Sequence, residues 1–144
     1  MTLSREAELV SGVTLLAVLT VMYGGWTLLG ILTHGSAGAA LPNFGLTETQ
    51  WALWRAGHAH AGVWLILSLV VQLLLDSSRL SPAMRWLARI CAPAAAVAMS
   101  AGLFGVAFLP AFRWVLYAGA LCLVFSLVLT SVGLLRKHPA LASG

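Results

Sequence analysis

Residues 51–75, WALWRAGHAHAGVWLILSLVVQLLL, form an apolar stretch in which Arg55 carries the one formal charge. A helix of roughly 20 residues crosses a hydrocarbon core of about 30 Å, so this stretch is long enough to span a membrane. It predicts a transmembrane helix that carries a polar segment, RAGHAHAG at residues 55–62, near one end.

The composition of the whole chain indicates the same environment. Of its 144 residues, 60% are hydrophobic and 8% are charged, and the mean hydropathy is +0.96. Soluble domains are about 25% charged, so this composition excludes a soluble fold. A chain of this length has room for a few membrane spans and for no second soluble domain of useful size. We therefore expect the functional site within or beside the spans.

The predicted fold class is all-α, an antiparallel bundle of four transmembrane helices in a single domain. The helices are expected over residues of about 9–32, 48–75, 82–109 and 114–135. The first stretch also resembles a signal peptide with a cleavage site at residues 37–39, but Glu6 and Glu8 oppose the basic start of such a peptide. We therefore expect this helix to be retained.

Two helix starts carry local signals. Thr47 and Gln50 have the spacing of a capping box, which predicts a helix that begins directly after Thr47. Ser81 and Pro82 suit the N-cap and the first helical position. The short link at residues 110–113 predicts that the third and fourth helices are neighbours.

Basic residues are unevenly distributed between the predicted spans. Arg55 and Arg113 lie at one side of the membrane, and the other side holds Arg5, Arg79, Arg85, Arg89, Arg136 and Lys137. The positive-inside rule then places both termini in the cytoplasm, for a multi-pass protein of a bacterial-type plasma membrane. We interpret Arg85 and Arg89 as anchors that reach the cytoplasmic headgroups. The net charge of +4 is a topology signal and indicates no nucleic-acid partner.

The histidines of the RAGHAHAG segment lie within the outer leaflet, where ionisable groups are costly and indicate function. Residues two apart on a helix point about 200° away from each other, so His58 and His60 cannot ligate one ion together. One ring should face the interior and the other a neighbouring helix or a second protomer. We therefore expect a homo-oligomer or a larger membrane complex in the lipid bilayer.

A haem b between the helices would use these residues. His58 or His60 would supply an axial imidazole, and His34 or a partner chain a second ligand. Arg55 and Arg113 would neutralise the propionates. Trp54 and Gly62 would lie beside the ring, as an aromatic neighbour and as a small residue that leaves space for a flat ligand. Copper or zinc at His58 or His60 is disfavoured, because these ions require three or four close ligands.

The segment RAGHAHAGVW resembles the haem-ligating second helix of haem-copper oxidase subunit I, and also small four-helix bacterial membrane proteins related to it. The resemblance implies that His58 or His60 is an axial haem ligand. The third and fourth predicted helices contain no histidine, whereas the oxidase core takes further ligands from its later helices. We therefore expect no oxygen-reducing binuclear centre.

Three functions of different class fit the sequence. The first is haem binding for electron transfer, sensing or haem handling. The second is a small transporter or proton relay in which His58 and His60 titrate. The third is a structural or accessory subunit whose histidines form hydrogen bonds between helices. No catalytic triad or phosphate-binding loop is evident, so no catalytic residue is predicted.

The chain has two cysteines, Cys91 and Cys122. Counted from the ends of the apolar runs at about 1.5 Å per residue, their depths in the membrane differ by well over 10 Å. The sequence therefore predicts that they form no disulfide within one chain.

Overall fold

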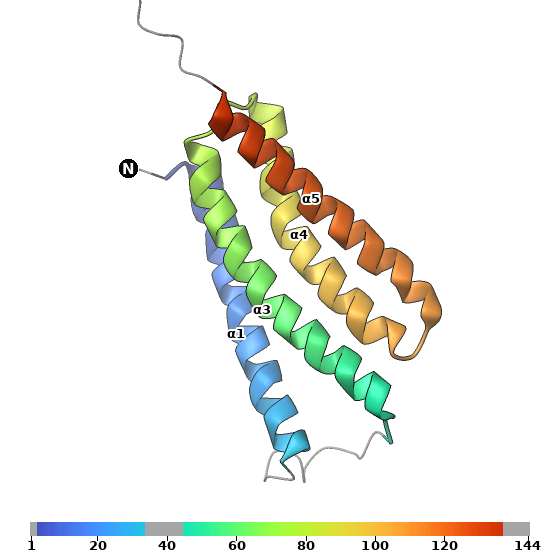
Figure 1. Ribbon diagram of the computed structural model, residues 1–144. Helices are drawn as coiled ribbons and strands as arrows, with labels where there is room; N and C mark the ends of the chain where they lie inside the picture. The colour runs from blue at the N-terminus through green and yellow to red at the C-terminus, as the bar shows by residue number, and fades with distance from the viewer. Residues whose placement is uncertain (1–2, 34–44, 137–144) are drawn as a thin grey trace, which may run out of the picture.

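The computed structural model describes residues 3–33 and 45–136, which form four long helices and one short 3-10 turn (Figure 1). The elements are α1 (Arg5–Leu32), α3 (Glu48–Asp76), α4 (Pro82–Val106), η1 (Pro110–Phe112) and α5 (Arg113–Leu135). Each of the four helices is long and apolar enough to cross a membrane. The predicted all-helical fold with four candidate spans is thereby confirmed.

The two predicted helix starts are confirmed as well. At α3 the Gln50 amide N–H donates to the Thr47 hydroxyl (3.3 Å), and the Gln50 side chain accepts from the Thr47 backbone N–H (2.8 Å). The side chain of Ser81 caps α4, and Pro82 occupies its first turn. Both signals act within a few residues, so they do not depend on the tertiary packing.

Two predicted helix bounds were wrong. Helix α1 begins at Arg5 instead of near residue 9, because the Ser4 hydroxyl accepts from the backbone N–H of Ala7 (3.3 Å) and caps the helix there. Helix α4 ends at Val106 instead of residue 109, because Pro110 disfavours a helical conformation at the preceding residue. Leu109 accordingly adopts an extended conformation, with φ −131° and ψ 110°.

The chain runs down α1, up α3, down α4 and up α5 in the view of Figure 1. One end of the molecule therefore holds the first turn of α1, the link at residues 77–81 and the last turn of α5; we call it the N-terminal end. The opposite end, here the η1 end, holds η1 and the start of α3. There the side-chain amide of Gln50 donates to the carbonyl of Ala107 (2.7 Å), which joins α3 to the end of α4.

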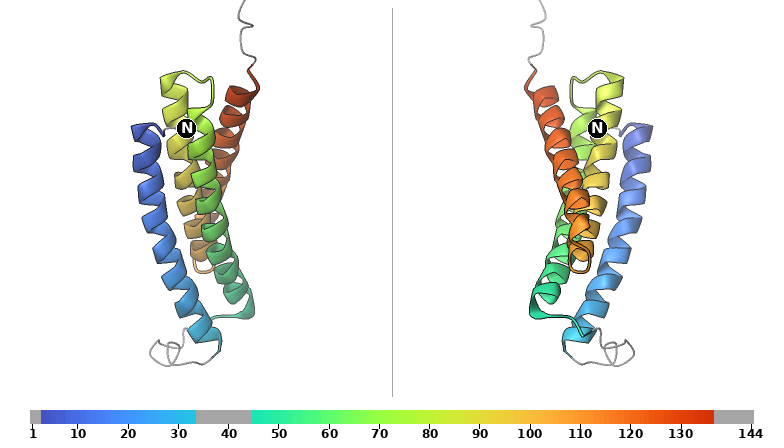
Figure 2. Two further views of the ribbon diagram at one scale, coloured as in Figure 1. Left: turned by 90° about the vertical axis from the view of Figure 1, so that its left-hand side faces the viewer. Right: turned by 90° about the vertical axis from the view of Figure 1, so that its right-hand side faces the viewer.

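Helices α3, α4 and α5 pack closely, whereas α1 lies at one edge of the molecule (Figure 2). A Cβ atom at Gly102 of α4 would lie 2.7 Å from the backbone nitrogen of Leu116, and one at Gly119 of α5 would lie 2.8 Å from that of Met99. These glycines therefore let the two backbones approach, as small residues do between membrane helices. On α1, by contrast, many large apolar side chains are exposed, among them Leu9, Val13, Leu16, Leu19, Met22 and Trp26.

Replacing Gly102 with alanine is expected to destabilise the fold by about 1–3 kcal/mol, because the added methyl group meets backbone atoms that cannot yield. The matched control is Gly12→Ala in α1, where a Cβ would meet nothing within 4 Å. That change should stabilise its helix by about 0.5–1 kcal/mol. Unfolding of the detergent-purified variants with sodium dodecyl sulfate would measure both effects. Equal stability of the two variants would contradict the close approach of α4 and α5.

Pro93 lies inside α4 and leaves a backbone carbonyl free to bond with α3. Because proline has no backbone N–H, it leaves the carbonyl of Arg89, four residues earlier, without its helical donor. The side-chain amide of Gln72 donates to this carbonyl instead (3.1 Å). The proline is thus accommodated by a fully buried polar side chain from the neighbouring helix.

The predicted separation of the cysteines was wrong. Cys91 and Cys122 line the same shallow apolar groove of about 460 Å³ on α4 and α5. From the N-terminal end, Cys91 lies about 13 Å along α4 and Cys122 about 20 Å along α5, a difference of about one helical turn. The helix actually starts at Pro82, well before the apolar run from which the depth was counted. Both thiols are free.

Candidate functional site

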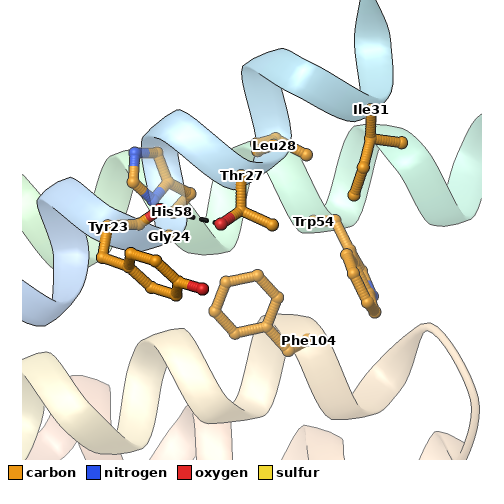
Figure 3. Close-up of a pocket in the computed structure, with 8 residues that line it drawn as sticks. All are labelled: Tyr23, Gly24, Thr27, Leu28, Ile31, Trp54, His58 and Phe104. Atoms are coloured by element: carbon orange, nitrogen blue, oxygen red, sulfur yellow. Dashed lines mark hydrogen bonds between the residues drawn. The ribbon is translucent and has the colours of Figure 1, made fainter. Parts of the chain in front are cut away.

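A cleft between α1, α3 and α4 lies toward the η1 end and contains one of the two histidines of the RAGHAHAG segment (Figure 3). Its volume is about 250 Å³. It is lined by Tyr23, Gly24, Thr27, Leu28, Ile31, Trp54, His58 and Phe104. We call this space the His58 cleft; its walls are mainly apolar and aromatic.

The ring of His58 lies against the backbone of α1 at a pair of glycines. A Cβ atom at Gly25 would lie 2.8 Å from Nε2 of His58, and one at Gly24 would lie 3.9 Å from Nδ1. The ring therefore sits in a notch at Gly25, where a Cβ atom would meet it, and is in ordinary contact distance of Gly24. In residues 3–33 and 45–136 neither ring nitrogen of His58 forms a hydrogen bond. The imidazole is thus held by shape, with its nitrogens packed against the backbone of α1.

Aromatic rings form the wall of the cleft that faces α4. The rings of Trp54 and Phe104 meet edge to face with 5.8 Å between their centroids, and Trp54 meets Phe108 in the same way at 5.9 Å. A Cβ atom at Gly57 would lie 3.2 Å from the Phe104 ring, so Gly57 makes room for that ring on α3. Edge-to-face pairs of this kind add stability beyond their buried area and fix the orientation of the rings.

Two hydroxyl groups on α1 accompany His58. The hydroxyl of Thr27 donates to the backbone carbonyl of Tyr23 (3.0 Å), so its proton is engaged within the helix. In Figure 3 the Tyr23 side chain points into the cleft, toward Phe104. A ligand in the cleft therefore meets one imidazole and one phenol among apolar groups.

His60 faces a different part of the surface. Its Nδ1 lies 2.8 Å from the backbone carbonyl of Ala56, in hydrogen-bond contact, and its ring lies 5.9 Å from that of Trp64. It lines a separate cavity of about 140 Å³ with Ala59, Val63 and Trp64, all from α3. The structure thus separates the two imidazoles, as their spacing of two residues on a helix requires.

The other predicted site residues are dispersed. Trp54 lines the His58 cleft, but Arg55 is exposed and Gly62 faces Val21 of α1, whose Cγ1 would be 4.0 Å from an added Cβ. Arg113 lies over the ring of Trp114, at 5.3 Å from its centroid, and does not line the cleft. His34 lies outside the described residues. No group of three or more metal-ligating side chains occurs in the described ranges.

A second cluster of polar residues joins three helices at the N-terminal end. Arg89 of α4 forms a salt bridge with Asp76 of α3, and it also donates to Gln72 (3.2 Å) and to the Ser4 hydroxyl (3.0 Å). Ser4, the N-cap of α1, donates from its backbone N–H and from its hydroxyl to Asp76 (2.8 and 2.7 Å). The side chain of Arg89 is 1% exposed, so its predicted role as a headgroup anchor was wrong. It is neutralised by Asp76 and donates hydrogen bonds to Gln72, Ser4 and Asp76 inside the protein.

Comparison of the chain with protein families, curated protein sequences and solved structures found no match.

Proposed function

We propose that this chain is an integral membrane protein, an antiparallel four-helix bundle with both termini in the cytoplasm, that binds haem b through His58. The site would lie in the outer half of the bilayer and serve electron transfer, sensing or haem handling. The orientation is supported by basic residues at the N-terminal end, where Arg5, Arg79 and Arg136 lie. Because Arg89 is buried, it no longer counts as an exposed basic residue at this end. The remaining arginines still give the N-terminal end its positive charge.

The observation that carries the proposal is the imidazole of His58 in a cleft of aromatic and apolar groups. Neutral imidazole is the commonest protein ligand of haem iron, and a surrounding apolar pocket excludes water from the iron. Among the described residues the cleft supplies one such donor, so a second axial ligand would come from His34 or from a partner chain. Arg55 lies one helical turn toward the η1 end of α3 and is exposed, which suits a partner for propionate groups.

The His58 cleft is too small for haem unless one of its walls moves. A volume of about 250 Å³ is below the roughly 300–1,000 Å³ of pockets that enclose a drug-sized ligand, so the closed cleft does not accommodate a whole macrocycle. Helix α1 is the wall that can move, because its side chains are mostly exposed along its length. Its polar contacts to the other helices, in the part of the chain that the structure describes, lie at Ser4. Haem binding therefore requires the η1 end of α1 to move away from His58.

An absorption spectrum tests the proposal. Protein expressed with an adequate haem supply and purified in detergent is expected to show a Soret band, with α and β bands that appear after reduction with dithionite. The control is the same preparation made without added haem and then titrated with hemin. A folded protein with a featureless spectrum, with and without hemin, would rule out haem b.

The packing of His58 favours one alternative, an accessory subunit whose histidine holds two helices together. Its ring fills the notch at Gly25 without any ligand. In that case His58→Ala would loosen α1 in a protein that never binds haem. Accessibility of a cysteine introduced at Thr27 to a maleimide reagent, with and without the His58 change, would detect this loosening.

A further inference from the structure

A small polar cavity of about 70 Å³ lies at the N-terminal end, between the first turns of α1 and α4. It is lined by Glu6, Pro82, Arg85, Trp86 and Arg89. Since Pro82 begins a candidate membrane span, the cavity lies at the level where the headgroups of a surrounding bilayer would be. The Trp86 side chain is 45% exposed beside it, in the position that tryptophan favours at a membrane surface.

One of the two arginines in this cavity has no oppositely charged partner among the described residues. Arg89 is neutralised by Asp76, but Arg85 has no carboxylate partner in the described ranges. The Nε atom of Arg85 is buried and has no acceptor, and its Nη2 makes one long bond, to the carbonyl of Leu80 (3.4 Å). Its Nη1 is not among the buried side-chain atoms and donates to no group in the described ranges, so it is the donor that a bound anion can reach.

The carboxylate of Glu6 is the second unmatched charge. It lines the same cavity and is exposed, yet within the described residues it forms no salt bridge with Arg85 or with another cation. The cavity thus presents one positive and one negative group that do not neutralise each other. A ligand with a phosphate and an ammonium group, a few bonds apart, would match both.

We propose that this cavity binds the phosphoethanolamine headgroup of a zwitterionic phospholipid. The phosphate oxygens accept hydrogen bonds from Arg85, and the ammonium group donates to Glu6 beside the face of Trp86. An anionic lipid without an ammonium group would satisfy Arg85 and place its negative charge near Glu6. A choline headgroup carries a positive charge but has no N–H to donate. The cavity should therefore prefer the primary ammonium of ethanolamine over both.

Native mass spectrometry of the full chain tests this preference. The detergent-purified protein is incubated with phosphatidylethanolamine, phosphatidylglycerol and phosphatidylcholine of identical acyl chains, and with free phosphoethanolamine or inorganic phosphate in separate arms. We expect the wild type to retain phosphatidylethanolamine over the other lipids by about fivefold. Glu6→Gln should abolish that preference, and Arg85→Gln should reduce retention of all three lipids.

The matched controls are Glu8→Gln and Arg136→Gln, which change exposed charges that do not line the cavity. Both should bind like the wild type, and circular dichroism verifies that each variant is folded. Binding of free phosphoethanolamine identifies the headgroup as the recognised part. Equal retention of the three lipids by the wild type would overturn the proposal. The same holds if the preference is unchanged in Glu6→Gln, or if inorganic phosphate binds as well as phosphoethanolamine.

Discussion

Replacement of Arg89 with methionine is expected to lower the free energy of unfolding by about 3–5 kcal/mol, one of the largest effects of any single change in this chain. The substitution leaves the carboxylate of Asp76, which is 10% exposed, without its counter-ion. It also removes the donors to Gln72 and Ser4. Breaking a buried ion pair from one side costs more than the pair itself contributes, because the remaining charge stays desolvated.

The double variant Arg89→Met/Asp76→Leu separates the ion pair from the rest of the cluster. It should recover most of the lost stability, since neither charge is then buried alone. Arg136→Met is the matched control, because this arginine is exposed and should change stability by less than about 0.5 kcal/mol. Unfolding in mixed micelles with sodium dodecyl sulfate measures all three variants. If the single Arg89 variant unfolds like the wild type, the buried ion pair does not contribute as the structure indicates.

The second large effect concerns the two histidines. His58→Ala should reduce haem occupancy on the order of tenfold or more, because it removes the imidazole of the cleft. His60→Ala should keep its Soret band, because His60 lines a separate cavity. Absorption at the Soret maximum per folded protein, measured after hemin titration, compares the two variants directly.

Gly25→Val provides an independent check on this assignment. The valine side chain would occupy the place of the His58 ring and hold α1 away from it, as haem binding requires, so haem occupancy should not fall below that of the wild type. Gly12→Val on the same helix meets no neighbour and is the control. Loss of haem in His60→Ala with retention in His58→Ala would reverse the assignment.

The fold was largely predictable because its signals are local. Apolar runs reveal the four helices, and the starts at Thr47 and Ser81 depend on residues within one helical turn. The burial of Arg89 was not predictable in the same way. It requires Asp76, thirteen residues earlier in the chain, to lie opposite it on a neighbouring helix.

For the candidate site, the sequence indicated the type of residue but not the arrangement. Helix α3 is apolar around most of its circumference, so periodicity does not show whether His58 or His60 faces the interior. Gly24 and Gly25 were not among the predicted site residues. Two adjacent glycines inside an apolar span are a signal for a close contact, but the partner that fills the notch becomes known only from the packing of α1 on α3.

The ion pair between α3 and α4 has a consequence for biogenesis. An arginine near the centre of a membrane helix costs about 2.5–3.5 kcal/mol during insertion, and Arg89 lies about 10 Å inside α4, so it carries part of that cost. Asp76, at the end of the preceding helix, is already synthesised when Arg89 emerges from the ribosome. Helices α3 and α4 should therefore enter the bilayer together as a hairpin, with the neutralising contact made before either helix is released into lipid.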